Sequence, residues 1–231
     1  MAEGEDLDAR LRQADPDRWL TSRFVADPAA RADLVVLYAF DAELARARRI
    51  ASQPLIGEIR LTWWREVLDE IDAGGLVRRH PVAEALAEVV RRRRLERQAL
   101  EAMIDGQIEL LGAAILSAAE AVAFADAVEG SAARLAAAIL DPASPPEAAG
   151  PAGRAWGLAL VFRAGLAPAD TIRPPLRAAL AEGRTAARRL SVAAFPAALP
   201  ARLARYDLLD RTPDTLEKQL SLVLAAVRGR I

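Results

Sequence analysis

Acidic side chains at helical spacing are the first candidates for chemistry in this sequence. Asp105 and Glu109 lie one helical turn apart in an apolar segment. Two carboxylates on one helix face are able to hold a metal ion or to exchange a proton with a substrate. For this pair a functional site and a solvated face are equally open interpretations. A solvated face is the better interpretation for a second acidic group, which consists of Glu66, Asp69 and Glu70.

Arg60 is the most conspicuous cation, because it falls within a predicted apolar stripe. The three- and four-residue spacing of apolar side chains after Pro54 predicts a helix with one buried face. Arg60 lies on that face, one turn before Trp64. Burying a guanidinium without an acceptor or an aromatic ring costs several kcal/mol. We therefore expect Arg60 and Trp64 to lie near a binding site. The predicted stripe is Ile56, Ile59, Trp63, Val67 and Ile71.

Composition excludes several classes of protein. The chain has no cysteine, so disulfides, thiolate nucleophiles and cysteine metal sites are absent. His80 is the only histidine and directly precedes Pro81, which favours a structural or solvated role. The net charge of -1 argues against binding nucleic acid through bulk electrostatics. Phosphate-binding loops, zinc-protease motifs and serine-hydrolase elbows are also absent.

The ends and apolar stretches of the chain predict a cytoplasmic protein. Residues 1–13 are acidic and lack an apolar core, so they do not resemble a signal peptide. The longest uncharged stretches are shorter than the roughly 18 residues that span a bilayer. We expect no transmembrane segment, although clusters of arginine permit peripheral association with the inner face of a membrane.

The elements that position these residues are expected to be helices. Hydrophobic residues make up 53% of the chain but aromatic residues only 5%, and a core of Ala, Leu and Val favours helix over strand. Asp27 and Pro28 predict a helix start, and the helix is expected to run to Arg49. A second helix is expected to begin at Pro54. The whole pattern predicts nine or ten helices without strands, with residues 1–16 frayed.

Two further features follow from the predicted helices. Arg91 to Arg94 form the last turn of a helix, where they suit the helix dipole. A solvated helix end is the better interpretation of this run, with an anionic partner or lipid surface as the alternative. Gly153 and Gly157 lie one turn apart, which permits another helix to pack closely.

Four segments in order resemble the squalene/phytoene synthase family between about residues 19 and 195. The resemblance implies an all-α, isoprenoid-synthase-like bundle, a single domain over residues 1–231 around a central cavity. It also implies that prenyl diphosphates are joined head to head with the help of Mg²⁺. The segments are LYAFDAELA (37–45), HPVAEALAEVV (80–90), EAMIDGQIEL (101–110) and GRAWGLALVFR (153–163).

The chain departs from this family where the family binds Mg²⁺. The aspartates of the first family motif are replaced by Ala45, Arg46 and Arg49, and no carboxylate follows Arg163 over the next five residues. Alanine cannot hold a hard cation, and arginine repels one. We therefore expect the metal-triggered loss of diphosphate to be absent. The residues that match the family are Tyr38, Phe40, Asp105 and Arg163, and Glu109 lies near a family aspartate.

A closer resemblance within the family is to the phytoene-synthase-like assembly factors of respiratory complex I and their bacterial relatives. It is carried by Phe40, Glu43, Arg60, Trp64 and the step at residues 56–57. This resemblance implies a non-catalytic role beside the membrane, with a respiratory-complex subunit as protein partner.

Three functional hypotheses follow. The first is a pseudoenzyme without a cofactor that binds a partner or a prenyl or lipid-like ligand, with Arg46, Arg49 and Arg163 gripping the anion in place of metal. The second is an active prenyl-diphosphate transferase with rearranged Mg²⁺ ligands. The third is a helical scaffold without a small-molecule site. The carboxylates available to the transferase are Asp41, Glu43, Asp105 and Glu109.

Overall fold

The computed structural model describes residues 6–51 and 53–231. Within these residues every regular element is a helix, which confirms the all-α prediction, and the helices are more numerous than the nine or ten expected. The α-helices are α1 (Leu7–Ala14), α2 (Pro16–Ser22), α3 (Pro28–Arg49), α4 (Pro54–Asp72), α5 (Pro81–Arg93), α6 (Arg97–Glu109), α7 (Ala118–Ala125), α8 (Ser131–Leu140), α9 (Gly150–Arg163), α10 (Ala169–Ala186), α11 (Pro200–Leu208) and α12 (Thr215–Arg228).

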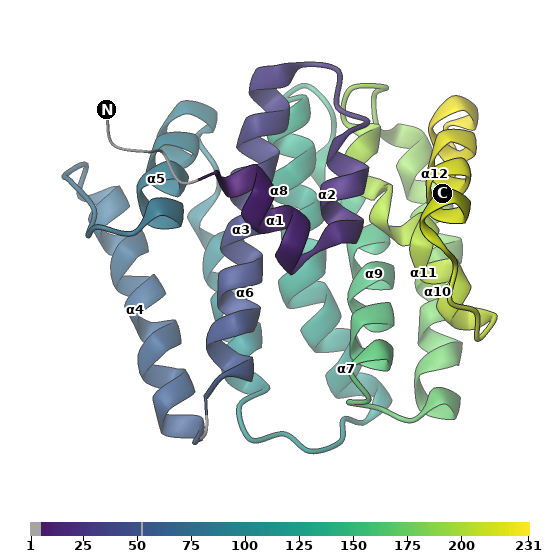
Figure 1. Ribbon diagram of the computed structural model, residues 1–231, viewed down its shortest axis with the longest axis horizontal. Helices are drawn as coiled ribbons and strands as arrows, with labels where there is room; N and C mark the ends of the chain where they lie inside the picture. The colour runs from purple at the N-terminus through teal and green to yellow at the C-terminus, as the bar shows by residue number, and fades with distance from the viewer. Residues whose placement is uncertain (1–5, 52) are drawn as a thin grey trace.

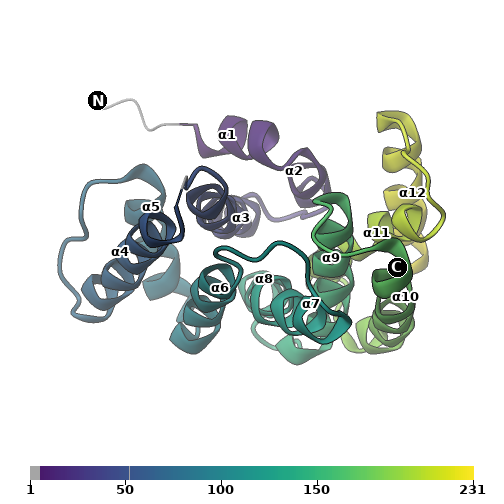
Figure 2. The same cartoon turned by 90° about the horizontal axis from the view of Figure 1, so that it is seen from below.

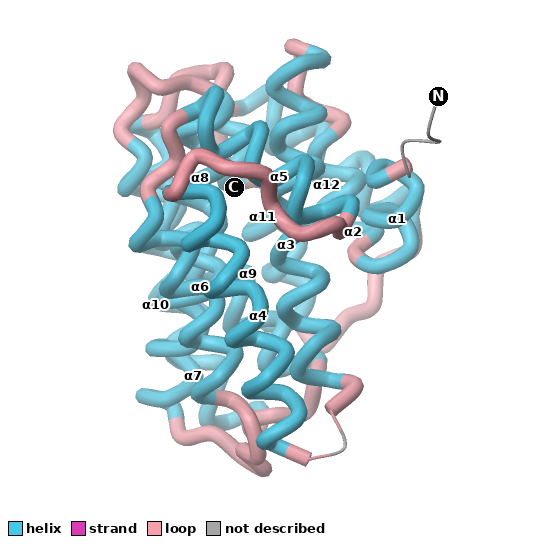
Figure 3. The backbone as a smooth tube through the Cα atoms, turned by 90° about the vertical axis from the view of Figure 1, so that its left-hand side faces the viewer, coloured by secondary structure: helices cyan, strands magenta, loops and turns pink. Residues whose placement is uncertain are grey.

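The long helices run roughly parallel to one axis, and most loops gather at the two ends of the bundle (Figures 1 and 3). Seen along that axis, α4 and α5 occupy one side, α3, α6, α7, α8 and α9 the middle, and α10, α11 and α12 the other side (Figure 2). Helices α1 and α2 lie across the bundle beside α3 and α9. In the described part of the chain, no helix has both the length and the apolar character needed to cross a bilayer.

The N-terminal segment is more ordered than expected. We predicted that residues 1–16 would fray, but α1 begins directly after Asp6, whose carboxylate accepts hydrogen bonds from the backbone N–H groups of Asp8 and Ala9. Leu11 is buried in the core. A side-chain cap and one buried anchor are enough to order a short helix against a larger bundle. Residues 1–5 of the predicted frayed segment lie outside the described part.

Helix α3 begins and ends where the sequence predicts. The Asp27 carboxylate caps its first turn, Pro28 occupies the first helical position, and Arg49 is its last residue. The predicted stripe on α4 is only partly right. Val67 and Ile71 are buried, but Ile56 and Ile59 are exposed. The buried stripe of α4 consists of Gly57, Leu61, Trp64, Val67, Leu68 and Ile71.

Helix α4 is rotated about its axis relative to the predicted orientation, because Trp64 packs against α3. The rings of Trp64 and Phe40 meet edge to face with centroids 5.2 Å apart, an arrangement that aromatic pairs favour. Arg60 is consequently exposed and does not carry the burial cost that the sequence suggested.

The run of four arginines at the end of α5 is partly structural. Arg92 and Arg93 both pair with Asp33 of α3, and the Arg93 Nε lies 2.7 Å from the carboxylate. Arg91 donates to the backbone carbonyl of Gly75. The run therefore fastens α5 to α3 and to the end of α4 instead of being wholly solvated.

Close packing of α9 is the last feature that shapes the interior. A short π-helix, Asp126–Gly130, joins α7 to α8. A Cβ placed on Gly153 would lie 2.2 Å from the backbone oxygen of Glu129, and one on Gly157 would lie 2.8 Å from the Ala125 Cβ. Both glycines therefore permit the close approach that their spacing predicts. Wide turns of this kind often occur at functional sites, and here the π-helix carries Glu129 toward the middle of the bundle.

Candidate functional site

A cavity of about 370 Å³ lies between α3 and α9 and is called the α3–α9 cavity below. Its wall combines charged side chains with an apolar part. Asp15 builds its rim, because it ends α1 and caps α2 by accepting a hydrogen bond from the backbone N–H of Arg18 at 2.9 Å. The lining residues are Ala14, Asp15, Pro16, Asp17, Asp41, Ala42, Ala45, Arg48, Arg49, Gln107, Phe124, Glu129, Trp156, Leu160, Val161, Arg163, Ala164 and Leu166.

Arg18 organises the first cluster of charges behind this wall. The residue is 2% exposed, and its guanidinium donates to the Asp41 carboxylate at 2.6 Å and pairs with Glu129. Its Nε lies 3.8 Å from Asp15. Three carboxylates thus surround one cation, and the other oxygen of Asp41, which is buried, has no hydrogen-bond partner among the described atoms. This cluster carries a local excess of negative charge.

Burial and charge shift the pKa values of this cluster in opposite directions. Burial alone would lower the pKa of Arg18, but the carboxylates of Asp41 and Asp15 more than offset it, so the pKa is raised. Burial raises the pKa of Asp15 in spite of Arg18. The Tyr38 ring lies 4.8 Å from the Arg18 guanidinium carbon, and burial raises the pKa of Tyr38 to about 12. Arg18 therefore stays charged and Tyr38 neutral at physiological pH.

Arg163 organises the second cluster. It donates to both oxygens of Asp207, each at 2.9 Å, and to Asp17 at 3.1 Å. Lys218 donates to the other oxygen of Asp17 at 2.7 Å, so two cations balance two carboxylates. Burial tends to lower the pKa of Arg163, but the hydrogen bonds and negative charges of Asp207 and Asp17 together outweigh it, and the pKa is raised. Its planar face lies 4.8 Å from the Trp156 ring centroid.

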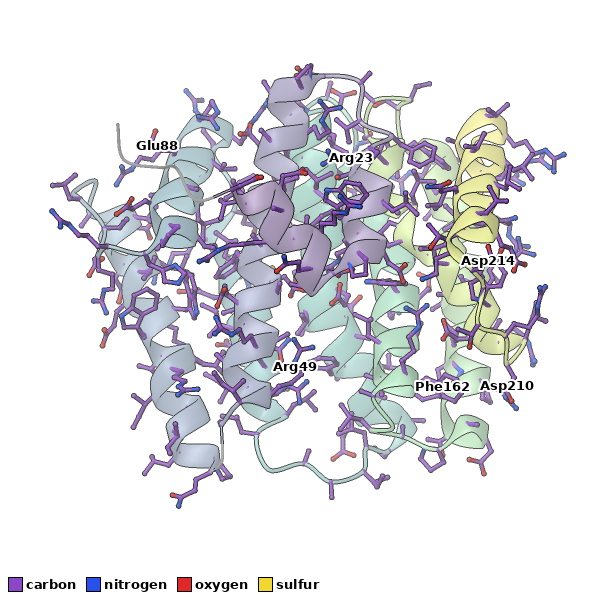
Figure 4. All side chains as sticks on the ribbon, in the orientation of Figure 1. Arg23, Arg49, Glu88, Phe162, Asp210 and Asp214 are labelled. Carbon is purple, nitrogen blue, oxygen red and sulfur yellow. The ribbon has the colours of Figure 1, made fainter. Side chains whose placement is uncertain are left out.

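The remaining cations of the cavity are Arg48 and Arg49, and neither has a carboxylate partner among the described residues. Arg48 donates to the side-chain oxygen of buried Gln107 at 2.8 Å. Burial and the neighbouring charge of Arg49 lower the pKa of Arg48. Arg49 is exposed, and its side chain lies on the side of α3 toward α9 (Figure 4). These two guanidiniums are therefore available to an anion.

The donor set of this cavity does not fit a Mg²⁺ ion. Asp41 and Glu129 already surround Arg18, and Asp17 is held by Arg163 and Lys218. Arg48 and Arg49, about two turns beyond Asp41 on α3, present two further guanidiniums, which repel a cation. The described residues also contain no group of three or more metal-ligating side chains. Guanidinium groups thus occupy the neighbourhood in which a metal would need free carboxylates.

The structure divides the residues that the sequence singled out. Arg49 and Arg163 line the α3–α9 cavity. A different group lines a groove of about 340 Å³ between α3 and α4, called the α3–α4 groove, in which Arg46 pairs with Glu43 at 3.4 Å. Three aromatic rings form its floor, because Trp63, Trp64 and His80 contact one another edge to face. The singled-out residues in the groove are Glu43, Arg46, Arg60 and Trp64.

Three singled-out residues lie in neither place. Tyr38 is buried beneath Arg18. Asp105 and Glu109 lie away from the cavity wall, where the inward residue of α6 is Gln107, and Asp105 pairs with Arg65 of α4 at 2.5 Å. Because α6 directs Gln107 inward, Asp105 and Glu109, each two positions away, lie on other sides of the helix.

Sequence reasoning missed the charged residues at the centre of the site. Arg18 meets Glu129 from another helix, and Arg163 meets Asp17 across 146 positions. No local spacing signals such pairs, because both partners are brought together only by the packing of α2 against α3 and α9. The one sequence feature that pointed to this region was the pair of Gly153 and Gly157, which marks where the π-helix and its Glu129 approach α9.

Comparison with known proteins assigns the family. The family model of squalene/phytoene synthases matches residues 11–164, more than half of the chain. A crystal structure of a dehydrosqualene synthase in complex with ligand has the same fold, with a TM-score of 0.72 over 96% of this chain and 94% of that one, at 13% sequence identity. A comparison with curated proteins found no significant match. The chain therefore belongs to the squalene/phytoene synthase family and has its isoprenoid-synthase-like helical fold.

Proposed function

We propose that this protein is a non-catalytic member of its family that binds an anionic prenyl or lipid-like ligand in the α3–α9 cavity. The observation that carries the proposal is the pairing of charges. The carboxylates of the cavity are already in contact with Arg18, Arg163 or Lys218, whereas Arg48 and Arg49 have no carboxylate partner in the described part of the chain. This pairing of charges supports an anionic ligand and not a metal cluster at the site.

The shape and lining of the cavity support this class of ligand. Its volume of about 370 Å³ lies within the range of small-molecule pockets. Phe124, Trp156 and Leu160 provide an apolar wall for the first isoprene units of a chain. Guanidinium groups bind phosphate in a planar, bidentate manner and remain charged at every physiological pH. We therefore expect a diphosphate or phosphate head group near Arg49 and an apolar chain beside Trp156.

Thermal unfolding with farnesyl diphosphate tests the proposal. Ligand at about one hundred times its dissociation constant stabilises a folded protein by roughly 2.7 kcal/mol, about 5–10 °C for a chain of this size. We expect this shift without Mg²⁺. Arg49→Ala removes charge-assisted hydrogen bonds of about 1.5–3 kcal/mol, which corresponds to a roughly ten- to hundredfold weaker affinity.

Arg46→Ala is the matched control, since Arg46 lies on the same helix but lines the α3–α4 groove. It should leave the affinity unchanged. Equal affinities of the native chain and Arg49→Ala would refute the cavity assignment, and the absence of any shift would leave the scaffold hypothesis.

A shift that requires Mg²⁺ would instead support a prenyl-diphosphate transferase with rearranged metal ligands. Asp41 is the one carboxylate of that hypothesis that lines the cavity, and one of its oxygens is buried without a hydrogen-bond partner among the described atoms. Release of inorganic diphosphate from farnesyl diphosphate would then be measured, and Asp41→Asn should abolish it.

We further propose that the protein acts in the cytoplasm, at the inner face of the membrane, in assembly of respiratory complex I with a subunit as partner. The resemblance of residues 39–71 supports this part of the proposal. Native gels of membranes from cells that lack the protein should show less assembled complex I, restored by the native chain. Unchanged complex I in those membranes would contradict this role.

A further inference from the structure

Helix α12 is apolar on two opposite sides. Its inner side packs Leu222 and Ala225 into the core. Its outer side presents a second apolar row at the edge of the bundle, where no other helix of the described chain covers it (Figure 2). The spacing of four, three, one and three residues places this row on one helix face. The row, called the outer stripe, consists of Leu216 (64% exposed), Leu220 (55%), Val223 (46%), Leu224 (46%) and Val227 (81%).

Arginines border the outer stripe. A pocket of about 260 Å³ between α10, α11 and α12 is lined by five of them. None has a carboxylate within ion-pair distance among the described residues, and Arg202 donates only to the Ser221 hydroxyl at 2.8 Å. The net charge of the whole chain is only -1, so this concentration of positive charge is local. The five, called the arginine rim, are Arg184, Arg202, Arg205, Arg228 and Arg230.

The acidic residues nearest this surface are already engaged. Glu217 pairs with Arg211 at 2.8 Å, and Asp214 caps the first turn of α12. Glu182 pairs with Arg154 at 3.0 Å. These carboxylates do not neutralise the arginine rim, which leaves an apolar row beside uncompensated cations.

We propose that this face of α12 docks onto an anionic lipid bilayer. Amphipathic helices of this kind lie in the plane of the interface, with apolar side chains between the head groups and basic side chains on the lipid phosphates. A second copy of this chain would bring the same cations to the interface, so an anionic surface is the better complement. A nucleic acid would neutralise the arginine rim but would leave the outer stripe in water. The inference goes beyond the ligand of the α3–α9 cavity and does not depend on it.

Vesicle flotation of the full chain tests the proposal. The vesicles contain phosphatidylcholine alone or phosphatidylcholine with about a quarter of phosphatidylglycerol. We expect the protein to float with the anionic vesicles and to be released as the salt concentration rises, because salt screens the attraction. Arg228→Gln with Arg230→Gln should weaken binding roughly 25-fold, at about fivefold for each arginine near the surface. Leu220→Ser with Val227→Ser should weaken it comparably at low salt.

Leu76→Ser with Arg79→Gln is the matched control. Leu76 is 99% exposed in the loop between α4 and α5, at the other side of the bundle, and Arg79 is also exposed there. The control should bind anionic vesicles as the native chain does, and all variants should unfold at the native temperature. The proposal would be overturned if the native chain bound neutral and anionic vesicles equally. It would also be overturned if the α12 variants bound anionic vesicles as tightly as the native chain does. A dimer that Val227→Ser dissociates, without vesicle binding, would show a self-association surface instead.

Discussion

Arg163 holds Asp207 by two parallel hydrogen bonds of 2.9 Å, although 44 positions separate the two residues in the chain. The third nitrogen of Arg163 reaches Asp17, which Lys218 also contacts. One guanidinium therefore joins α9 to α11 and to the first turn of α2, and Lys218 ties α12 to the same point. In this structure Arg163 therefore serves as an internal cross-link.

Removal of that cross-link should destabilise the fold. Arg163→Gln leaves Asp17 and Asp207 without their shared partner, and a broken buried pair costs about 3–5 kcal/mol. The side chain of Arg163 is 34% exposed, so solvent should reduce the loss to about 1–3 kcal/mol. Urea denaturation measures the change. Arg189→Gln, which breaks an exposed pair with Glu147, should cost less than about 1 kcal/mol, and equal losses in the two variants would contradict the role of Arg163.

Arg18→Met should have a larger effect that depends on pH. The substitution leaves Asp41 and Glu129 buried without a cation, at a cost of about 3–5 kcal/mol near neutral pH. Burial without a cation disfavours the charged form of a carboxyl group, so acidification should restore stability to the variant. The difference from the native chain should therefore shrink between about pH 7 and pH 4.

Addition of Asp41→Leu and Glu129→Leu to Arg18→Met should recover much of the lost stability, because a well-packed apolar replacement avoids burying charge. A deficit that remains constant with pH would show that Arg18 acts through packing and not through its charge.

Gly153 should not accept a side chain. A Cβ at this position would lie 2.2 Å from the Glu129 backbone oxygen and 2.6 Å from the Ala133 Cβ. Gly153→Ala should force the π-helix away from α9 and lower the free energy of unfolding by about 1–3 kcal/mol. Gly75→Ala is the control, since nothing lies within 4 Å of a Cβ there. Thermal or urea unfolding of both variants measures the effect, and equal stability would rule out a close approach at Gly153.

His80 should titrate below its ordinary pKa. Burial against Trp63 and Trp64 lowers the pKa of the imidazole from its usual value near 6.5. A base whose folded pKa is depressed stabilises the fold fully above the unfolded pKa and loses this contribution as the pH falls through the folded pKa. Stability should therefore decrease on acidification below about pH 6.5, and His80→Asn should remove that component.

Nuclear magnetic resonance provides a direct measurement, because His80 is the only histidine and supplies a single imidazole signal. A midpoint at or above about 6.5 would contradict the effect of burial. The unfolding free energies of the native chain and His80→Asn near pH 7.5 and pH 5 provide the independent test.

The helices could be predicted because their signals are local. Asp27 and Pro28 mark the start of α3, and Pro54 marks the start of α4. Caps and first-turn prolines act within a few residues of themselves, so their effect does not depend on the rest of the fold. The rotation of α4 was not predictable to the same accuracy. The sequence pattern placed Ile59 and Trp63 on the buried face, whereas in the structure Trp64 is buried against Phe40 and Ile59 is exposed.

The sequence by itself determined the all-α class, the family resemblance and the absence of metal-binding aspartates at Ala45, Arg46 and Arg49. Tertiary structure alone decided which charges meet. It placed Arg49 at the α3–α9 cavity and Arg46 in the α3–α4 groove, three positions apart on one helix. It also brought Arg18 to Asp41 and Glu129. Helix formation depends on neighbours in sequence, whereas ion pairing depends on neighbours in space, and the packing of distant helices sets those neighbours.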